Sequence, residues 1–252
     1  MMSSRSVVLI APVRTAIGTF DGSLKEIPAP ELGALAIKAA VARAGLHPDE
    51  VGTAVMGNVV QAGAKMNPAR QAAIHAGLPV SVPAMTVNRV CGSGAQAIVS
   101  AAQEILLGAV DVAVAGGMEN MDLAPYLIAR GRWGYRTGDG QLYDSMLRDG
   151  LNDAFSDEAS GWHTEDLVRE FQVGRDAQDR WALRSQQWGR ARAREETSES
   201  RGMPCLFLNT GRARVAFGAT KRLKIEGFRG FRGVLCVKMP EKTRTRESRA
   251  AA

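Results

Sequence analysis

The chain has 252 residues, 45% of them hydrophobic and 23% charged, which is enough apolar sequence for one large globular domain or two modest ones. No stretch reaches the roughly 18 uncharged apolar residues of a membrane span, and the N-terminal sequence does not show the apolar region of a secretory signal. The three widely spaced cysteines indicate neither a disulfide framework nor a zinc site. We therefore expect a cytoplasmic protein without a membrane partner.

The net charge of +6 is unevenly distributed along the chain. Residues 188–252 carry 16 Lys and Arg against 6 Asp and Glu, a net charge of +10, which leaves −4 for residues 1–187. This basic tail shows no sustained helical or strand period, and we predict that it is disordered. It also lacks the ordered aromatic residues of a base-stacking surface, so we expect no nucleic-acid partner, and an arm that binds nucleic acid is the less favoured alternative.

Strands and helices alternate along the first part of the chain. The apolar runs predict strands at 6–12, 51–59, 84–90 and 111–117, and the amphipathic or glycine-bounded segments between them predict helices at 30–45, 67–77 and 92–108. Asn67 is placed to cap the second helix, with Pro68 as its first residue and Gly77 at its end. Alternation of this kind predicts a sheet covered by helices, so we assign residues 1–120 to an α/β layered core with a βαβαβαβ order.

The pattern changes after residue 120. Residues 121–157 are rich in glycine and aromatic side chains and have no clear period, and long excursions of this kind in compact domains are usually functional or contact partners. Residues 164–187 are again helical, with Leu167, Val168 and Phe171 forming an apolar stripe. A second helix is expected to begin near Arg175. We treat residues 121–187 as a separate part of the chain.

Cys91 lies where the third predicted strand gives way to the third predicted helix. The thiolate is the nucleophilic form of cysteine, and the N–H groups and dipole of a helix N-terminus favour an anion. Gly92 and Gly94 leave the backbone open to a bulky substrate and keep N–H groups available for an oxyanion. Such a site suits acyl transfer through a thioester. The structural alternative is a small buried hydrophobic residue at the end of a strand.

Four long segments of the chain resemble the thiolase family, of the acetyl-CoA acetyltransferase and 3-ketoacyl-CoA thiolase kind. They are "NPARQAAIHAGLPVSVPAMTVNRVCGSGAQAI", "AVAGGMENM", "RWGYRTGDGQLYDSMLRDGLNDAF" and "GRDAQDRWALRSQQ". The resemblance runs from about residue 5 to residue 187 and is specific, because the segments follow one another in the family's order. The "VCGSG" segment alone would also fit a β-ketoacyl synthase, but the third segment argues against that family.

The resemblance implies transfer of acyl groups between coenzyme A and acetyl-CoA by Claisen condensation, or the reverse cleavage. Cys91 matches the family's acylated cysteine, with its backbone N–H in the oxyanion hole. Leu151 matches a position that lines the pantetheine channel, and His163 lies near a family histidine of that channel. The sequence around His163 departs from the family's pattern, so a solvated loop histidine is the alternative.

The resemblance also implies the partners of the protein and the role of its loop domain. Residues 121–187 match the part of the family that covers coenzyme A and contacts other subunits, although the match is incomplete. We therefore expect acetyl-CoA and acyl-CoA as substrates, no separate cofactor or metal, and a homo-oligomer.

The second half of the family is not matched by this chain. That half supplies an asparagine in an "NEAFA" motif, a histidine in a "GHP" motif and a second cysteine followed by glycines. None of these motifs follows Gln187, no histidine follows His163, and neither Cys205 nor Cys236 precedes a glycine run. We therefore expect a truncated, poorly active acyltransferase.

Two further hypotheses follow from the same break in the sequence. The chain could be a non-catalytic fragment that binds coenzyme A or contacts other subunits. The abrupt change to an arginine-rich tail also suggests a shift of reading frame in the gene.

Overall fold

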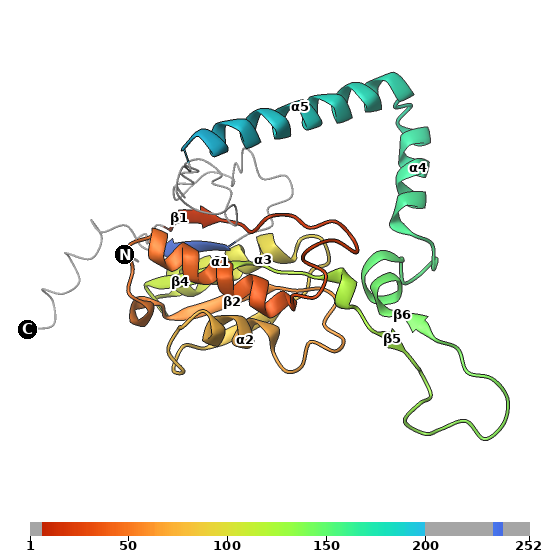
Figure 1. Ribbon diagram of the computed structural model, residues 1–252, viewed down its shortest axis with the longest axis horizontal. Helices are drawn as coiled ribbons and strands as arrows, with labels where there is room; N and C mark the ends of the chain where they lie inside the picture. The colour runs from red at the N-terminus through yellow and green to blue at the C-terminus, as the bar shows by residue number, and fades with distance from the viewer. Residues whose placement is uncertain (1–6, 200–233, 239–252) are drawn as a thin grey trace, which may run out of the picture. The chain divides into compact units, whose positions relative to one another are not determined.

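The computed structural model describes residues 7–199 and 234–238, with side chains up to residue 191. The described residues divide into two compact units. The first unit holds the chain up to Leu123 together with the strand at 234–238, and the second begins at Ala124. In the first unit, helices pack on both faces of one sheet (Figure 1). The predicted α/β layered fold is therefore confirmed.

One five-stranded sheet forms the centre of the first unit, in the order β1-β7-β4-β2-β3. Because β2 pairs in parallel with both β3 and β4, the carboxyl ends of these three strands lie side by side. β7 runs antiparallel between β1 and β4. The strands are β1 (Val8–Val13), β2 (Thr53–Gly57), β3 (Ala84–Val87), β4 (Val112–Gly117) and β7 (Val234–Lys238).

The three helices predicted for this unit are present, with ends within two residues of the expected ones. The Asn67 Oδ1 accepts a hydrogen bond from the Arg70 N–H at 3.2 Å and so caps the second helix. Gly108 ends the third helix with a φ of 80°, a conformation that favours glycine. The helices are α1 (Ala29–Arg43), α2 (Pro68–His75) and α3 (Ser93–Leu107), with short 3-10 turns at Pro48–Glu50 and Met121–Leu123.

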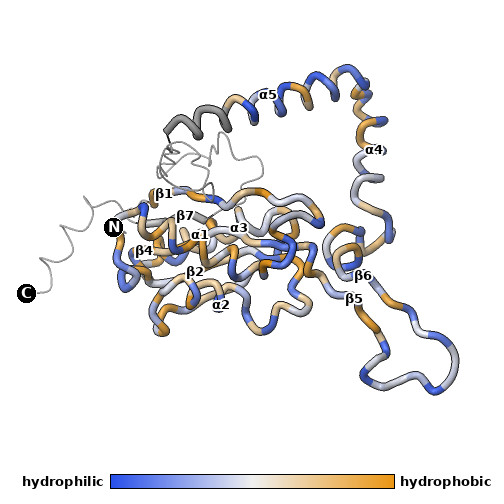
Figure 2. Tube along the Cα trace, viewed as in Figure 1, coloured by the Kyte–Doolittle hydropathy of each residue, from blue (hydrophilic) through white to orange (hydrophobic). Residues whose placement is uncertain are grey.

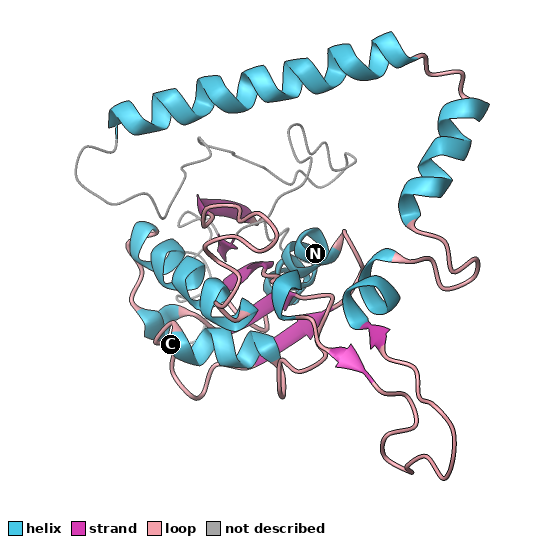
Figure 3. Ribbon diagram, turned by 45° about the vertical axis from the view of Figure 1, so that its right-hand side comes forward, coloured by secondary structure: helices cyan, strands magenta, loops and turns pink. Residues whose placement is uncertain are grey.

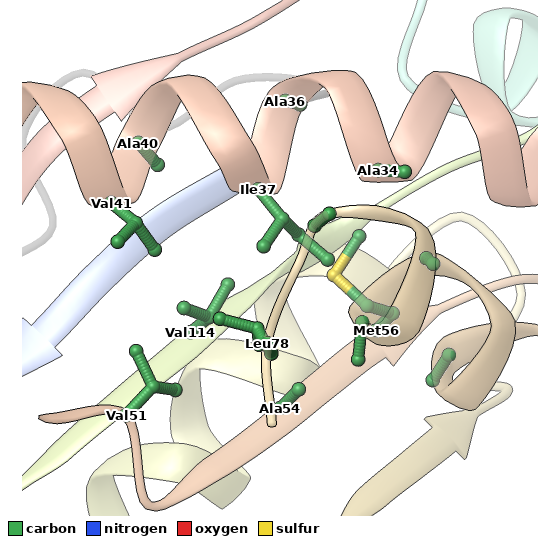
Figure 4. Packing of buried hydrophobic residues seen from close by; sticks show 14 of the residues in the cluster. Ala34, Ala36, Ile37, Ala40, Val41, Val51, Ala54, Met56, Leu78 and Val114 are labelled. Atoms are coloured by element: carbon green, nitrogen blue, oxygen red, sulfur yellow. The ribbon is translucent and has the colours of Figure 1, made fainter. Parts of the chain in front are cut away.

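Alternate side chains of the central strands serve two separate cores. On β2, Ala54 and Met56 pack under α1 and α2, whereas Val55 faces α3. The same alternation holds on β4, as expected for a strand whose successive side chains point to opposite faces. Figure 4 shows Ile37 of α1 directed toward Val114 of β4. Each face of the sheet is therefore covered, which is typical of parallel strands.

Among the described helices, α3 alone is long and apolar enough to cross a membrane by length and composition, over Val90–Leu107. It contains one charged residue, Glu104. Ala97, Ala101 and Ile105 are fully buried and pack against the sheet. These contacts are those of a core helix.

The second unit has little buried surface of its own. Leu167 is 52% exposed and Phe171 69% exposed, so the predicted apolar stripe is not buried within the described residues. Much of the loop between β5 and β6 is hydrophilic (Figure 2). The helices α4 and α5 follow each other along the chain as two separate helices (Figure 3). The elements are β5 (Tyr126–Leu127), β6 (Tyr143–Asp144), a π-helix (Leu147–Leu151), α4 (Ser160–Glu170) and α5 (Arg175–Glu199).

Two pieces of the predicted disordered tail form regular structure, so the prediction is wrong for them. α5 continues past Gln187 to Glu199, because the residues there include alanine, arginine and glutamate, which favour helices. The run Val234–Lys238, with valines and leucine, becomes a central strand in which Cys236 pairs with residues of both β1 and β4. The rest of the tail, including Cys205, lies outside the described residues.

β7 gives the first test. It joins β1 to the rest of the sheet. Leu235 pairs with Ala115 of β4, so a proline there should remove a ladder hydrogen bond and loosen β7. We expect the more protected of the Leu9 and Ile10 amides to exchange about tenfold faster, from the loss of about 1.5 kcal/mol for one ladder hydrogen bond.

The matched control is Leu127→Pro in β5, which belongs to the other unit and pairs with one strand. It should leave exchange in β1 unchanged. Unaltered protection of Leu9 and Ile10 in Leu235→Pro would show that β7 does not hold β1.

Candidate functional site

The chain turns sharply between the end of β3 and the start of α3. Val90 has a φ of 48°, a conformation that is rare for a β-branched residue. Its N–H donates to the Oδ1 of Asn88 at 2.9 Å. The N–H groups of Gly92 and Ser93 then donate to the carbonyls of Arg89 and Val90, both at 3.0 Å. This turn carries Cys91.

The Ser93 side chain is hydrogen bonded to the backbone of this turn. Its side chain is 5% exposed, and its Oγ accepts from the Arg89 N–H at 2.9 Å and donates to the Val90 carbonyl at 2.6 Å. The side chain therefore satisfies two backbone groups on either side of the strained residue. Ser93 is a local clamp that the sequence analysis did not identify.

Glycines let the first turn of α3 approach the strand ends closely. A Cβ at Gly57, the last residue of β2, would lie 2.6 Å from the Ser93 carbonyl carbon and 2.8 Å from the Gly94 nitrogen. A Cβ at Gly117, the last residue of β4, would lie 3.3 Å from the Gly94 Cα. The turn with Cys91 is thus held against the carboxyl ends of two strands.

Cys91 is an exposed free thiol at this turn. The exposure does not fit the alternative of a small buried hydrophobic residue. The sequence predicts that the backbone N–H groups around Gly92 and Gly94 are available for an oxyanion. For Gly92 this is wrong, because its N–H already donates to a carbonyl within the turn. Within the described part of the chain, no group is hydrogen bonded to the Cys91 sulfur.

The other two predicted site residues belong to the second unit. Leu151 ends the π-helix and is 36% exposed. His163 lies on α4 rather than in a loop, and its Nε2 is 2.9 Å from the Oγ of Ser156. The predicted roles of both residues in a pantetheine channel remain predictions.

Asp153 organises the turn that precedes α4. Its Oδ1 accepts from the N–H groups of Ser156 at 2.9 Å and Phe155 at 3.0 Å. These backbone hydrogen bonds, with help from the nearby His163, hold the pKa of the Asp153 carboxyl below its ordinary value. The same Asp153 oxygen lies 3.1 Å from the Ser156 Oγ, so Ser156 links it to His163.

Polar side chains also follow each of the three parallel strands. Asn58 comes directly after β2, and Asn88 comes directly after β3. Glu119 follows β4 with only Met118 between them. The sequence analysis gave these three residues no role. Their common signal is a polar residue just after a buried strand, which in parallel sheets marks the edge where sites form. Among the residues that the structure describes, no group of three His, Cys, Asp or Glu could hold a metal ion.

The family model described as "Thiolase, N-terminal domain" matches residues 7–202. An acetyl-CoA acetyltransferase of Cupriavidus necator is 51% identical over 180 residues, covering 71% of this chain and 46% of the relative. A protein of the same name from Pseudomonas aeruginosa is 51% identical over 183 residues, covering 73% and 47%. The chain thus spans about half the length of the curated relatives it matches.

A solved structure agrees with the sequence matches. The crystal structure of the Bacillus anthracis acetyl-CoA acetyltransferase superposes with a TM-score of 0.78 at 32% identity. The match covers 96% of this chain and 67% of that one.

The close approach at Gly57 yields a test of the packing. Gly57→Ala would place a methyl group against backbone atoms of Ser93 and Gly94, which cannot move as a side chain can. We expect a loss of about 1–3 kcal/mol in the free energy of unfolding, measured by denaturant titration. Gly161→Ala on α4 is the matched control, because a Cβ there meets nothing within 4 Å. Equal stability of the two variants would refute the packing argument.

The Asp153 turn yields a pH test. Hydrogen bonds to the charged carboxylate lower its pKa, so their stabilisation is present at neutral pH and is lost as pH falls through the lowered value. We expect the Phe155 and Ser156 amides to keep their protection from hydrogen exchange through the ordinary titration range of an aspartate and to lose it only in stronger acid. Asp153→Asn should show no such acid transition. Loss of protection in the wild-type chain already within the ordinary range would contradict this assignment.

Proposed function

The chain belongs to the thiolase family, and on that premise we propose that Cys91 accepts an acyl group from a coenzyme A thioester. The observation that carries the proposal is the exposed thiol on a strained turn at the start of α3. A nucleophile needs such access, and a helix N-terminus favours the negative charge that forms during attack.

The proposed reaction is a thioester exchange. The Cys91 sulfur bonds to the carbonyl carbon, the bond from that carbon to the coenzyme A sulfur breaks, and coenzyme A leaves with the proton that the cysteine loses. Negative charge develops on the carbonyl oxygen in the transition state and needs a hydrogen-bond donor. Because the N–H groups of Gly92 and Ser93 are used within the turn, the N–H of Cys91 itself is the proposed donor.

The full reaction of the family would require further groups. Condensation of the acyl group with acetyl-CoA needs a base that removes a proton from the acetyl carbon and an acid that returns it. Each such group contributes about 100-fold to 10,000-fold to a rate, and none is hydrogen bonded to Cys91 among the described residues. We therefore propose that this chain performs the first transfer slowly and completes the cycle poorly.

The second unit is proposed to contribute the coenzyme A side of the site and the contacts of a homo-oligomer. Two features support this proposal. Leu151 ends a π-helix, a feature that is frequent at functional sites, and Trp133 and Phe155 are largely exposed, as expected for side chains that a partner covers. A fragment that only binds coenzyme A is the alternative function.

Acetylation of Cys91 distinguishes acyl transfer from the binding of coenzyme A alone. Purified chain incubated with acetyl-CoA should gain one acetyl group on the peptide that contains Cys91, as read by peptide mass spectrometry, with release of an equal amount of coenzyme A. Cys91→Ala should abolish both signals, because the acceptor sulfur is removed.

Cys91→Ser is the conservative control, since it keeps a hydroxyl in place of the thiol and should react far more slowly. Binding of coenzyme A without any acetylation would favour the non-catalytic fragment. Turnover at the rate of an ordinary thiolase would contradict the proposal that this chain completes the cycle poorly.

A further inference from the structure

We propose that Glu119 and Asn88 are positioning residues for Cys91, acting through hydrogen bonds that join the carboxyl ends of β4, β2 and β3. This inference rests on the proposed acyl transfer at Cys91, and it adds two residues that do not touch the acyl group. The role of Glu119 does not follow from the position of the cysteine in the sequence, because Glu119 lies 28 residues away from it.

Glu119 holds the loop after β2. Its Oε2 accepts from the Val59 N–H at 2.8 Å and lies 3.4 Å from the Val60 nitrogen. Its Oε1 accepts from the Asn58 side chain at 2.7 Å. One carboxylate therefore fixes both the side chain and the backbone that follow the central parallel strand. Hydrogen bonds to a charged acceptor are stronger than those between neutral groups.

Asn88 connects the loop after β2 to the turn that carries Cys91. Its Nδ2 lies 3.4 Å from the Val59 carbonyl, and its Oδ1 accepts from the Val90 N–H at 2.9 Å. The side chain thus bridges the loop after β2 and the residue that precedes Cys91. Because Asn88 uses its donor for one element and its acceptor for the other, moving either element disturbs the other.

Val90 shows why such support is needed. A β-branched residue at a φ of 48° is strained, and strain of this kind persists only when surrounding contacts hold it. The hydrogen bond that the Val90 N–H donates to Asn88 and the hydrogen bonds of the Ser93 side chain supply those contacts. Without Asn88, Val90 can relax to a negative φ, and that rotation changes the direction of the Cys91 side chain.

Asn58 is a second sign that this network serves a site. It is 1% exposed, and its amide nitrogen donates to the Met118 carbonyl at 3.3 Å and to Glu119. Its Oδ1 has no hydrogen-bond partner among the described protein atoms. A buried unsatisfied oxygen is costly, and such groups in native proteins concentrate where function or a bound water requires them.

The test compares reactivity of Cys91 in variants of the full chain. Asn88→Ala should lower the rate of Cys91 alkylation by iodoacetamide and of acetylation by acetyl-CoA about fivefold each, the effect of losing one net hydrogen bond. Glu119→Gln should act in the same direction, because its amide nitrogen must face one of two donors, Asn58 or Val59. Asn88→Ser should recover part of the rate, since a hydroxyl can still accept from the Val90 N–H.

The matched control is Gln71→Ala on α2, which also removes two side-chain hydrogen bonds to the backbone, in this case to the carbonyls of Ala64 at 2.7 Å and Met66 at 2.9 Å. It should leave both rates unchanged. A merely structural network would lower the melting temperature in Asn88→Ala without slowing Cys91 in the folded protein, and that result would overturn the inference. If Asn88→Ala does not fold, a wild-type rate in Glu119→Gln overturns it instead.

The two reagents keep this inference separate from the proposed function. Iodoacetamide reports the reactivity of the thiol whether or not the protein uses coenzyme A. A wild-type chain that is alkylated but never acetylated would sink the proposed acyl transfer, and with it the role of these residues in that reaction. Equal alkylation and acetylation in wild type and both variants would sink the positioning role alone.

Discussion

The close contact between the first turn of α3 and the strand ends is the constraint on which the candidate site depends. Gly57 and Gly117 end two neighbouring parallel strands against which α3 begins. Gly57 has no room for a Cβ, and a Cβ at Gly117 would make a tight contact with Gly94. The turn before α3 must therefore be short and sharp, and Val90 takes a strained backbone conformation to make it. Cys91 is exposed on this turn.

Much of the first unit follows from the sequence. The apolar runs that become β2 and β4 are buried on both faces, and the glycines and the Asn67–Pro68 pair mark helix ends correctly. Local signals suffice there because each element is short and its boundaries are set by residues with strong backbone preferences. The position of Cys91 at the strand-to-helix junction follows from the same signals.

Two features could not be predicted in this way. β7 takes a place between β1 and β4, yet nothing in its short apolar run indicates pairing with strands more than 100 residues earlier in the chain. The link from Glu119 to Asn88 is equally non-local, because it exists only once three strands lie side by side. The place of β7 and the link from Glu119 to Asn88 both depend on how the strands pair across the sheet, and not on the preference of any one residue.

Side chains anchored on the strand ends hold the turn that presents Cys91. Amide hydrogen exchange of Arg89 and Val90 in the unmodified chain tests this claim most directly, since their N–H groups donate to Ser93 Oγ and Asn88 Oδ1. We expect both amides to exchange more slowly than those of an unstructured peptide and to be protected together with β3. Exchange of both amides at the unstructured rate, with β3 still protected, would contradict it.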